Sequence, residues 1–249
     1  MSRTVLITTA THREIKALDK LAAGMPGTLS TLVTGIGPVA TVYAIMNYLA
    51  SNGKPDLVIN IGIAGSYNEQ LPPGSVVVPL SDRFADLGVA SGRQFIPISR
   101  AGIDISDNYT PSGEYYADSD LAGRMSAGIR PVRAVTLSTT TGSSEVRNMI
   151  SAEFKADIES MEGAAVYYVC NMEKIPCLGL RAVSNMVGPR DRSSWKVEMA
   201  LEKFPADLAS NVRSPQRDNP STWNINLSER YICFRCHGEW QDRYRRPGI

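Results

Sequence analysis

The feature that most constrains the fold is a regular alternation between short β-branched, apolar runs and longer segments with helical periodicity. The apolar runs predict strands at 4–10, 29–37, 56–61, 74–79, 132–137 and 177–183. Helices are predicted at 11–22, 38–50, 143–154, 162–172 and 193–204, with a short extended segment at 156–160. Strands that alternate with helices build mostly parallel sheets covered on both faces. We therefore expect an α/β fold with three layers, in which helices flank a twisted, mostly parallel mixed sheet.

Two regions depart from this alternation. Residues 90–130 are polar and show no strong period, so we expect them to form an excursion above the sheet. Pro205 should end the last helix, and the chain after it is charged and aperiodic. We therefore divide the chain into one domain at 1–205 and an atypical C-terminal tail at 206–249, whose composition is compatible with disorder.

Charge and composition narrow the classes of partner. The 26 Lys and Arg residues nearly balance 25 Asp and Glu, so no overall field attracts nucleic acid or an anionic membrane. No apolar stretch approaches the roughly 20 residues that cross a bilayer, and the N-terminal apolar run is too short for a signal peptide. Cys170 and Cys177 lie in apolar segments, where cysteine is a small buried residue. These features predict a cytoplasmic protein that binds a small ligand.

Unusual residues gather where the predicted strands end. Open parallel sheets bind their ligands beyond the carboxyl ends of the strands. The residues at these ends are Glu14, Gly35–Gly37, Gly62–Gly65, Met161–Gly163, Ser184 and Asn185. Their convergence predicts a ligand site at this edge and is a stronger signal than any of the motifs alone.

Each motif also has a simpler structural explanation. Thr11 to Glu14 has the T-x-x-E spacing of a helix capping box, which by itself accounts for Glu14. Glu162 opens a helix, where an acid favours the dipole, yet a carboxylate there can also accept hydrogen bonds from the vicinal hydroxyls of a ribose. Asn185 can be a turn residue. These alternatives stay open on spacing alone.

Two further motifs point to cofactors only weakly. The segment "GIGPVA" at 35–40 fits the glycine pattern of a dinucleotide site, but it follows the second strand, and a tight strand-to-helix turn explains it. The segment "CFRCH" at 233–237 matches a haem attachment motif within the aberrant tail, and no export signal accompanies it. We expect neither cofactor.

Six segments, taken in order, resemble one known group of enzymes. They are "ATHREIKAL", "VTGIGPVATVYA", "VINIGIAGSY", "GSVVVPLSDRFADLGV", "DIESMEGAAVYYVC" and "RAVSNMVGPRDRSSWKVEMAL". Over about residues 4–204 the chain resembles the nucleoside phosphorylase and nucleosidase superfamily, and within it the futalosine hydrolase family most closely. The resemblance implies a phosphorylase-like fold, and the tail departs from it.

The resemblance also implies roles for matched residues. Glu14 falls where nucleosidases carry the carboxylate that deprotonates the attacking water. Met161 and Glu162 fall on the ribose-binding pair. Asn185 falls where adenine-specific nucleosidases place an aspartate. Asn60 stands where phosphorylases present an arginine to phosphate, so water becomes the expected nucleophile.

An amide at position 185 suits a 6-oxopurine. Its NH₂ can donate to O6 and its carbonyl can accept from N7–H, whereas adenine would face it donor to donor. The expected binding residues are Gly62, Ile63, Ala64, Phe84, Gly142, Met161, Glu162 and Ser184, with Glu14 and Asn185 as the catalytic pair. Candidates for holding the substrate carboxylate of futalosine are Arg83, Arg93, Arg190 and Arg192.

We therefore expect an N-ribosyl hydrolase that cleaves futalosine to hypoxanthine and dehypoxanthine futalosine in menaquinone biosynthesis. The family implies no metal or cofactor and a homodimer. The nearest alternatives are a methylthioadenosine/S-adenosylhomocysteine nucleosidase and a purine nucleoside phosphorylase. More distant ones are a dinucleotide-dependent oxidoreductase and a catalytically silent nucleoside-binding module.

Overall fold

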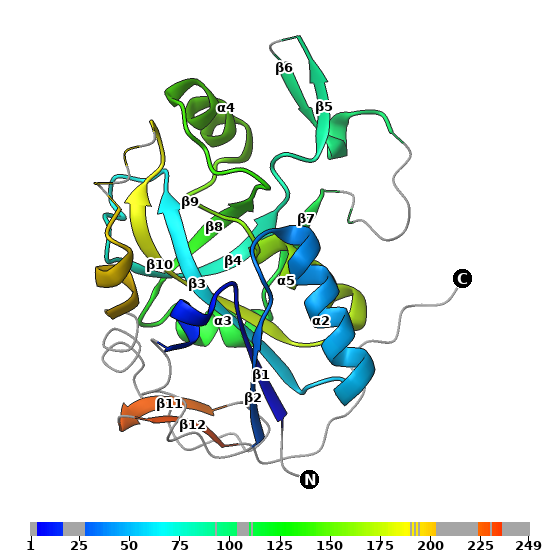
Figure 1. The fold of residues 1–249 in the computed structure, drawn as a ribbon, viewed down its shortest axis with the longest axis vertical. Coiled ribbons are helices and arrows are strands. Elements are labelled where there is room, and N and C mark those ends of the chain that lie inside the picture. Colours follow the sequence, from blue (N-terminus) through cyan, green and yellow to red (C-terminus); the bar gives the residue numbers. More distant parts are fainter. Residues whose placement is uncertain are drawn as a thin grey trace.

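The computed structural model describes residues 4–16, 28–92, 94–103, 110, 112–189, 191, 193, 195–202, 224–229 and 231–235. Its centre is an eight-stranded sheet (Figure 1). The strands are β1 (Thr4–Thr9), β2 (Thr28–Val33), β3 (Leu57–Ser66), β4 (Val76–Arg83), β7 (Glu114–Tyr116), β8 (Arg130–Thr136), β9 (Ile158–Ser160) and β10 (Cys177–Met186). Their order is β10-β4-β8-β9-β3-β1-β2, with β7 beside β4. The expected α/β class and the mixed sheet are confirmed.

Part of this sheet closes on itself. Strand β10 pairs with β3 as well as with β4, so β3, β10, β4, β8 and β9 form a ring. The β3–β10, β4–β8 and β8–β9 pairs are parallel, while β10–β4 and β3–β9 are antiparallel. β3 is buried along nearly its whole length, as expected for a strand covered on both faces.

Helices cover the sheet. They are α2 (Pro38–Asn52), α3 (Ser119–Met125), α4 (Ser144–Phe154) and α5 (Gly163–Glu173), with further helical residues at 12–16 and 197–202. α5 is buried over most of its first eight residues, which carry no charge, and it packs against α2 (Figure 1). Ser143 caps α4 by accepting from the Val146 N–H at 3.2 Å. No helix in the described part of the chain is both long and apolar enough to cross a membrane.

Three expectations need correction. Strand β3 runs on to Ser66, through "GIAGS", which we expected to be a loop. Strand β10 continues to Met186, so Ser184 and Asn185 lie within the strand and not beyond it. The cause is close packing: a Cβ at Gly65 would lie 2.9 Å from Val187 Cγ2, so small residues are needed where the strand remains paired. Small residues such as those of "GIAGS" are also typical of loops, so the sequence pattern predicted the strand end too early.

The third correction concerns residues 90–130, which carry more structure than an excursion. A hairpin of β5 (Gly88–Ser91) and β6 (Gln94–Pro97) lies at the start of this region. A 3₁₀ turn at Ile98–Arg100, β7 and α3 follow it along the chain. The elements are short, so their periodicity is too brief to detect in sequence. Of the predicted first helix, 12–16 is helical and 17–22 lies outside the described residues.

In the tail, the described residues form two antiparallel strands, β11 (Asn224–Glu229) and β12 (Tyr231–Arg235). Cys236 and His237 of the haem-like motif lie outside the described residues.

We propose that 1–205 is the folded domain and that the tail is dispensable. Truncation after residue 205 should then shift the melting temperature by no more than about 2 °C, because surface changes away from the core alter stability by about 0.5 kcal/mol or less. Insolubility of the truncated protein would show instead that the tail packs on the domain.

Candidate active site

Glu14 combines the two roles that its sequence context leaves open. Its Oε2 accepts from the Thr11 N–H at 2.8 Å and from the Thr11 hydroxyl at 2.9 Å, which confirms the capping box. Its Oε1 turns the other way and accepts from the Ile63 N–H at 3.3 Å. A Cβ at Gly62 would lie 3.0 Å from the same Oε1. The capping oxygen thus anchors the carboxylate, and the second oxygen lies against β3.

Glu162 is the N-cap residue of α5, but its side chain does not cap that helix. Its Oε1 instead accepts from the Gly37 N–H at 3.0 Å, on the turn that leads into α2. Burial raises the pKa of Glu162, the Gly37 N–H and Arg181 oppose that rise, and the charge of Glu14 adds to it. The two glutamates therefore belong to one electrostatic site.

The turn before α2 has a role different from the one that its glycine motif suggests. Gly35 and Gly37 have φ values of 82° and 90°, which favour glycine, and a tight turn is confirmed. In a dinucleotide site, backbone N–H groups of such a turn face the pyrophosphate. Here the Gly37 N–H is bonded to Glu162. This contact with Glu162 explains the glycine turn without a bound dinucleotide.

Asn185 lies on β10, the strand that pairs with β3, which Glu14 contacts. In the sheet it pairs with Gly65, next to a bulge at Ser184. The Ser184 hydroxyl lies 2.8 Å from Asn185 Oδ1 and 3.2 Å from the Ala64 carbonyl, and its single proton can donate to either acceptor. Asn185 Nδ2 donates to the Met186 carbonyl at 3.0 Å, which leaves its second proton for a ligand.

Strand β3 thus contacts Glu14 and also pairs with the strand that carries Asn185. Glu14 lies at Gly62 and Ile63, and Asn185 lies at Gly65. The two to three residues of strand between these contacts span about 7 to 10 Å, which suits a nucleoside with its sugar at one end and its base at the other. A carboxylate and an amide that are distant in sequence are therefore placed along one stretch of backbone.

The other predicted binding residues take varied positions. Phe84 is half-buried, pairs with Thr136 and packs edge-on against Tyr115, with ring centroids 6.0 Å apart. Met161 is half-buried beside Glu162, and Gly142 is exposed in the loop before α4. Among the described residues, no group of three His, Cys, Asp or Glu side chains gathers as a metal site would require.

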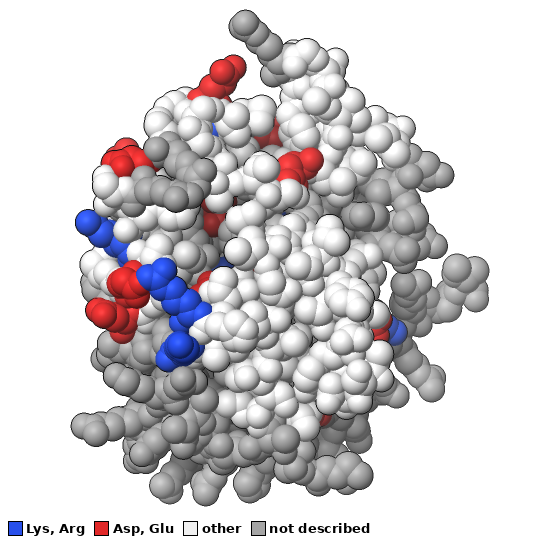
Figure 2. Space-filling model, in the orientation of Figure 1, with Lys and Arg blue, Asp and Glu red and all other residues white. Residues whose placement is uncertain are grey.

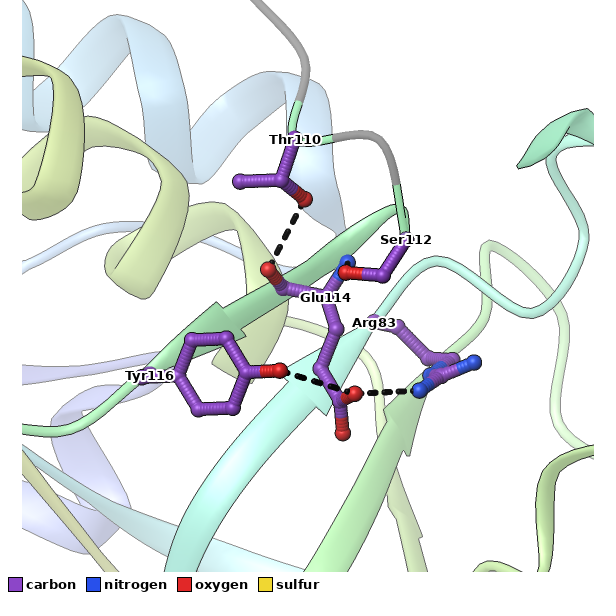
Figure 3. Close-up of polar contacts among 5 residues, drawn as sticks. All are labelled: Arg83, Thr110, Ser112, Glu114 and Tyr116. Carbon is purple, nitrogen blue, oxygen red and sulfur yellow. Dashed lines mark hydrogen bonds and ion pairs between the residues drawn. The ribbon is translucent and has the colours of Figure 1, made fainter.

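Arg83 is already engaged by another group. Figure 3 shows Arg83 and Tyr116 both directed at the Glu114 carboxylate. The Arg83 guanidinium lies 2.5 Å from Glu114 Oε2, the Tyr116 hydroxyl donates to the same oxygen at 3.1 Å, and the guanidinium stands 5.7 Å from the centroid of the Phe154 ring. These contacts oppose a role for Arg83 in binding substrate. Arg93, Arg190 and Arg192 lie outside the described residues.

A buried polar network beneath the site was not predicted. Arg181 is 3% exposed and donates to the Asn60 carbonyl at 3.0 Å, to the Leu180 carbonyl at 2.9 Å, and to Asn60 Oδ1. Asn60 Nδ2 in turn donates to the Thr8 hydroxyl at 3.0 Å. The one available signal was a charged residue in the middle of an apolar strand. Its positive charge partly offsets the burial of Glu162.

Asp82 belongs to the same network. The Thr136 hydroxyl donates to Asp82 Oδ1 at 3.0 Å and accepts from the Ala164 N–H at 2.8 Å, so Asp82 helps to anchor the start of α5. A Cβ at Gly163 would lie 2.1 Å from Asp82 Oδ2, so only glycine fits there. Burial, opposed by Arg181, raises the pKa of Asp82 from 3.8 to about 7.

This raised pKa predicts a pH-dependent stability. The folded protein keeps the Asp82 proton that the unfolded chain releases above pH 3.8, so stability is full below that pH and falls until about pH 7. The loss is on the order of 4 kcal/mol. Urea unfolding at pH 5, 6, 7 and 8 should show a smaller decline in Asp82→Asn than in the wild type. Exposed Glu69, changed to Gln, is the control and should keep the wild-type slope; equal slopes in all three proteins would refute the prediction.

Comparison with known proteins places these features in a family. Residues 8–213 match the model of the phosphorylase superfamily. The chain belongs to this superfamily. A curated futalosine hydrolase of Streptomyces coelicolor is 33% identical over 182 residues, covering 71% of this chain and 75% of that protein. One from Acidothermus cellulolyticus is 31% identical over 229 residues, covering 84% and 91%. Within the superfamily, the chain therefore belongs with the futalosine hydrolases.

Solved structures agree on the fold. The native futalosine hydrolase of Helicobacter pylori superposes with a TM-score of 0.71 at 20% identity, covering 85% of this chain and 98% of that one. A mutant 5'-methylthioadenosine/S-adenosylhomocysteine nucleosidase of H. pylori gives 0.70 at 19%, covering 85% and 99%. The expected phosphorylase-like fold is thus confirmed. At these identities, the two structures do not separate the two substrates.

Proposed function

We propose that this member of the phosphorylase superfamily hydrolyses the N-ribosidic bond of futalosine, releasing hypoxanthine and dehypoxanthine futalosine in menaquinone biosynthesis. The curated relatives support this reaction. The structural observation that carries the substrate assignment is Asn185, an amide held beside Gly65, two residues along β3 from the Ile63 N–H that donates to the Glu14 carboxylate.

The proposed chemistry uses Glu14 and Glu162 at the sugar. Cleavage passes through a sugar with oxocarbenium character, as the C1′–N9 bond breaks and its electron pair leaves on the purine. Water oxygen bonds to C1′, and Glu14 takes one of the water protons as general base. Glu162 accepts from the ribose hydroxyls, and its negative charge favours the developing cation.

Asn185 acts on the leaving group. The departing 6-oxopurine carries a proton at N7, supplied by solvent, and an acceptor at O6. The carbonyl of Asn185 accepts from N7–H and its NH₂ donates to O6. The Ser184 hydroxyl, which holds Asn185 Oδ1, fixes this orientation of the amide.

The closest alternatives are a methylthioadenosine nucleosidase and a phosphorylase. The only support for the nucleosidase is the similarity of fold to a solved structure of such an enzyme. The second needs a cation for phosphate, and Arg181 is committed to the carbonyls of Asn60 and Leu180. Both alternatives can be tested in one assay.

That assay incubates the protein with futalosine, inosine and methylthioadenosine, each with and without phosphate, and identifies the products. Hypoxanthine from futalosine, at a rate that phosphate does not change, supports the proposal. Ribose 1-phosphate derivatives would indicate a phosphorylase, and adenine as the main product would indicate an adenine-specific nucleosidase.

We also propose a homodimer. One face of α2 carries three exposed apolar side chains, and Ile36 in the preceding turn continues their spacing of three and four residues. The exposed fractions are 63% for Ile36, 84% for Val39, 73% for Tyr43 and 41% for Met46. α2 contains no charged residue, and Figure 2 shows a broad uncharged surface over it. Such a face, with no charge to solvate it, is typical of subunit interfaces.

Charge on this face should therefore separate the subunits. Val39→Glu is expected to shift the protein from dimer to monomer, because an isolated carboxylate is costly to bury in an apolar interface. Mass measured by light scattering across a concentration series tests this. The matched control is Val146→Glu on α4, where Val146 is 38% exposed. A wild type that is monomeric at every concentration would refute the dimer.

We further propose that the protein acts in the cytoplasm. Cys170 and Cys177 are buried free thiols. Free thiols are the rule in reducing compartments, which supports this location.

A further inference from the structure

Glu159 is a buried acid on β9 that the proposed chemistry does not use. It is 7% exposed. Its Oε2 accepts from the Tyr67 hydroxyl at 2.5 Å, and its Oε1 accepts from the Thr141 N–H at 3.1 Å. The Tyr67 and Thr141 hydroxyl oxygens are 3.4 Å apart. The three residues therefore form a closed polar cluster.

This cluster lies beside Asn185. Gly65 pairs with Glu159 on one side and with Asn185 on the other. Residues directly opposite each other in neighbouring strands project to the same face of a sheet. A Cβ at Gly65 would lie 3.4 Å from Glu159 Cγ and 3.3 Å from Asn185 Nδ2. Glu159 and Asn185 thus flank one glycine, whose missing side chain lets both side chains approach the same point of β3.

The cluster also ties down the loop at 138–143. This loop leaves β8 and enters α4 at Ser143. Thr141 is only 9% exposed, although Gly142 and Ser143 after it are exposed. A second tie comes from α4, where Arg147 donates to the Tyr67 carbonyl at 2.9 Å. Thr141 therefore holds the loop against the sheet, in addition to the Ser138 N–H, which donates to Asp86 Oδ2 at 2.6 Å.

We propose that Glu159 is a specificity-determining positioning residue, which fastens the 138–143 loop beside Asn185 and so shapes the end of the site that receives the purine. This inference rests on the proposed function, in which Asn185 contacts the base. A carboxylate suits the task because both of its partners are donors. Glutamine can replace it in part. Its carbonyl oxygen can accept from the Thr141 N–H, which can only donate, and its NH₂ can donate to the Tyr67 hydroxyl, which can turn to accept.

The first test follows the loop without turnover. Hydrogen–deuterium exchange in 138–143 is compared in the full-length wild type, Glu159→Gln, Glu159→Ala and Tyr67→Phe. The matched control is Glu145→Gln, an exposed acid next to the loop. We expect exchange to rise roughly tenfold in Glu159→Ala, the effect of losing one hydrogen bond, and less in Glu159→Gln. Exchange at the wild-type rate in Glu159→Ala would overturn the proposal. If that variant fails to fold, exchange at the wild-type rate in both Tyr67→Phe and Glu159→Gln would overturn it.

The second test follows selectivity. The ratio of kcat/KM for futalosine to that for methylthioadenosine should fall roughly tenfold in Glu159→Ala and recover in part in Glu159→Gln. The KM for futalosine should rise more than kcat falls. A merely structural residue would lower the active fraction and leave both the ratio and KM unchanged, which would overturn the proposal. Failure of the proposed function is distinguishable, because the wild type itself would then leave futalosine intact while the exchange test still decides the role of Glu159.

Discussion

The Glu14→Gln protein should lose about 100- to 10,000-fold in kcat, the contribution of a general base, while its affinity for futalosine changes little. Glutamine has the same shape, and its carbonyl can still accept from the Thr11 N–H and hydroxyl, now at 2.8 and 2.9 Å from the carboxylate. Its amide cannot take a proton from water. Steady-state kinetics and calorimetric titration with futalosine measure the two quantities separately.

The control removes the cap and keeps the carboxylate. Thr11→Ala should cost about 1 kcal/mol of stability, typical for a lost helix cap, and should lower kcat far less than Glu14→Gln does. If the Glu14→Gln protein kept full activity, Glu14 would be a capping residue only. If the two variants lost activity equally, the orientation of the helix would matter more than the base.

The fold class and the position of Glu14 at a helix start could be predicted, because each depends on a local pattern in the sequence. The T-x-x-E spacing placed Glu14 at a helix start, and the alternation of elements placed that start at a sheet edge. The pattern could not show which way each Glu14 oxygen points, since that depends on Ile63, 49 residues away. A capping acid and a general base are compatible here because the two oxygens face different partners.

What the sequence could not predict depends on distant pairs. The closure of the ring requires β10 to lie beside both β3 and β4, and no local periodicity encodes that pairing. The role of Arg181 appears only when Asn60 is placed next to it. No local pattern distinguishes Glu159 from other acidic residues, because its role depends on contacts with Tyr67 and Thr141. Strand ends were misplaced where glycines allow close packing, as at Gly65.

The second large effect is expected from Asn185→Asp. The carboxylate would keep the acceptor for N7–H but lose the donor to O6, and it would also lose the donor to the Met186 carbonyl. Each unpaired group costs about 1 to 3 kcal/mol, so kcat/KM for futalosine should fall about 5- to 150-fold. Adenine presents an amine where a 6-oxopurine presents O6, so the same change should favour methylthioadenosine.

The ratio of kcat/KM for the two substrates is the measurement that tests this, because folding defects cancel in it. Asn185→Ala is the control, since it removes both contacts without adding an acceptor and should slow futalosine cleavage without favouring adenine. Glu159 flanks Gly65 opposite the introduced carboxylate, so like charges would meet across one glycine and make adenine binding weaker than in a site evolved for it. The change should therefore reduce the preference for futalosine more than it creates an efficient adenine nucleosidase, and an unchanged ratio would show that Asn185 does not select the base.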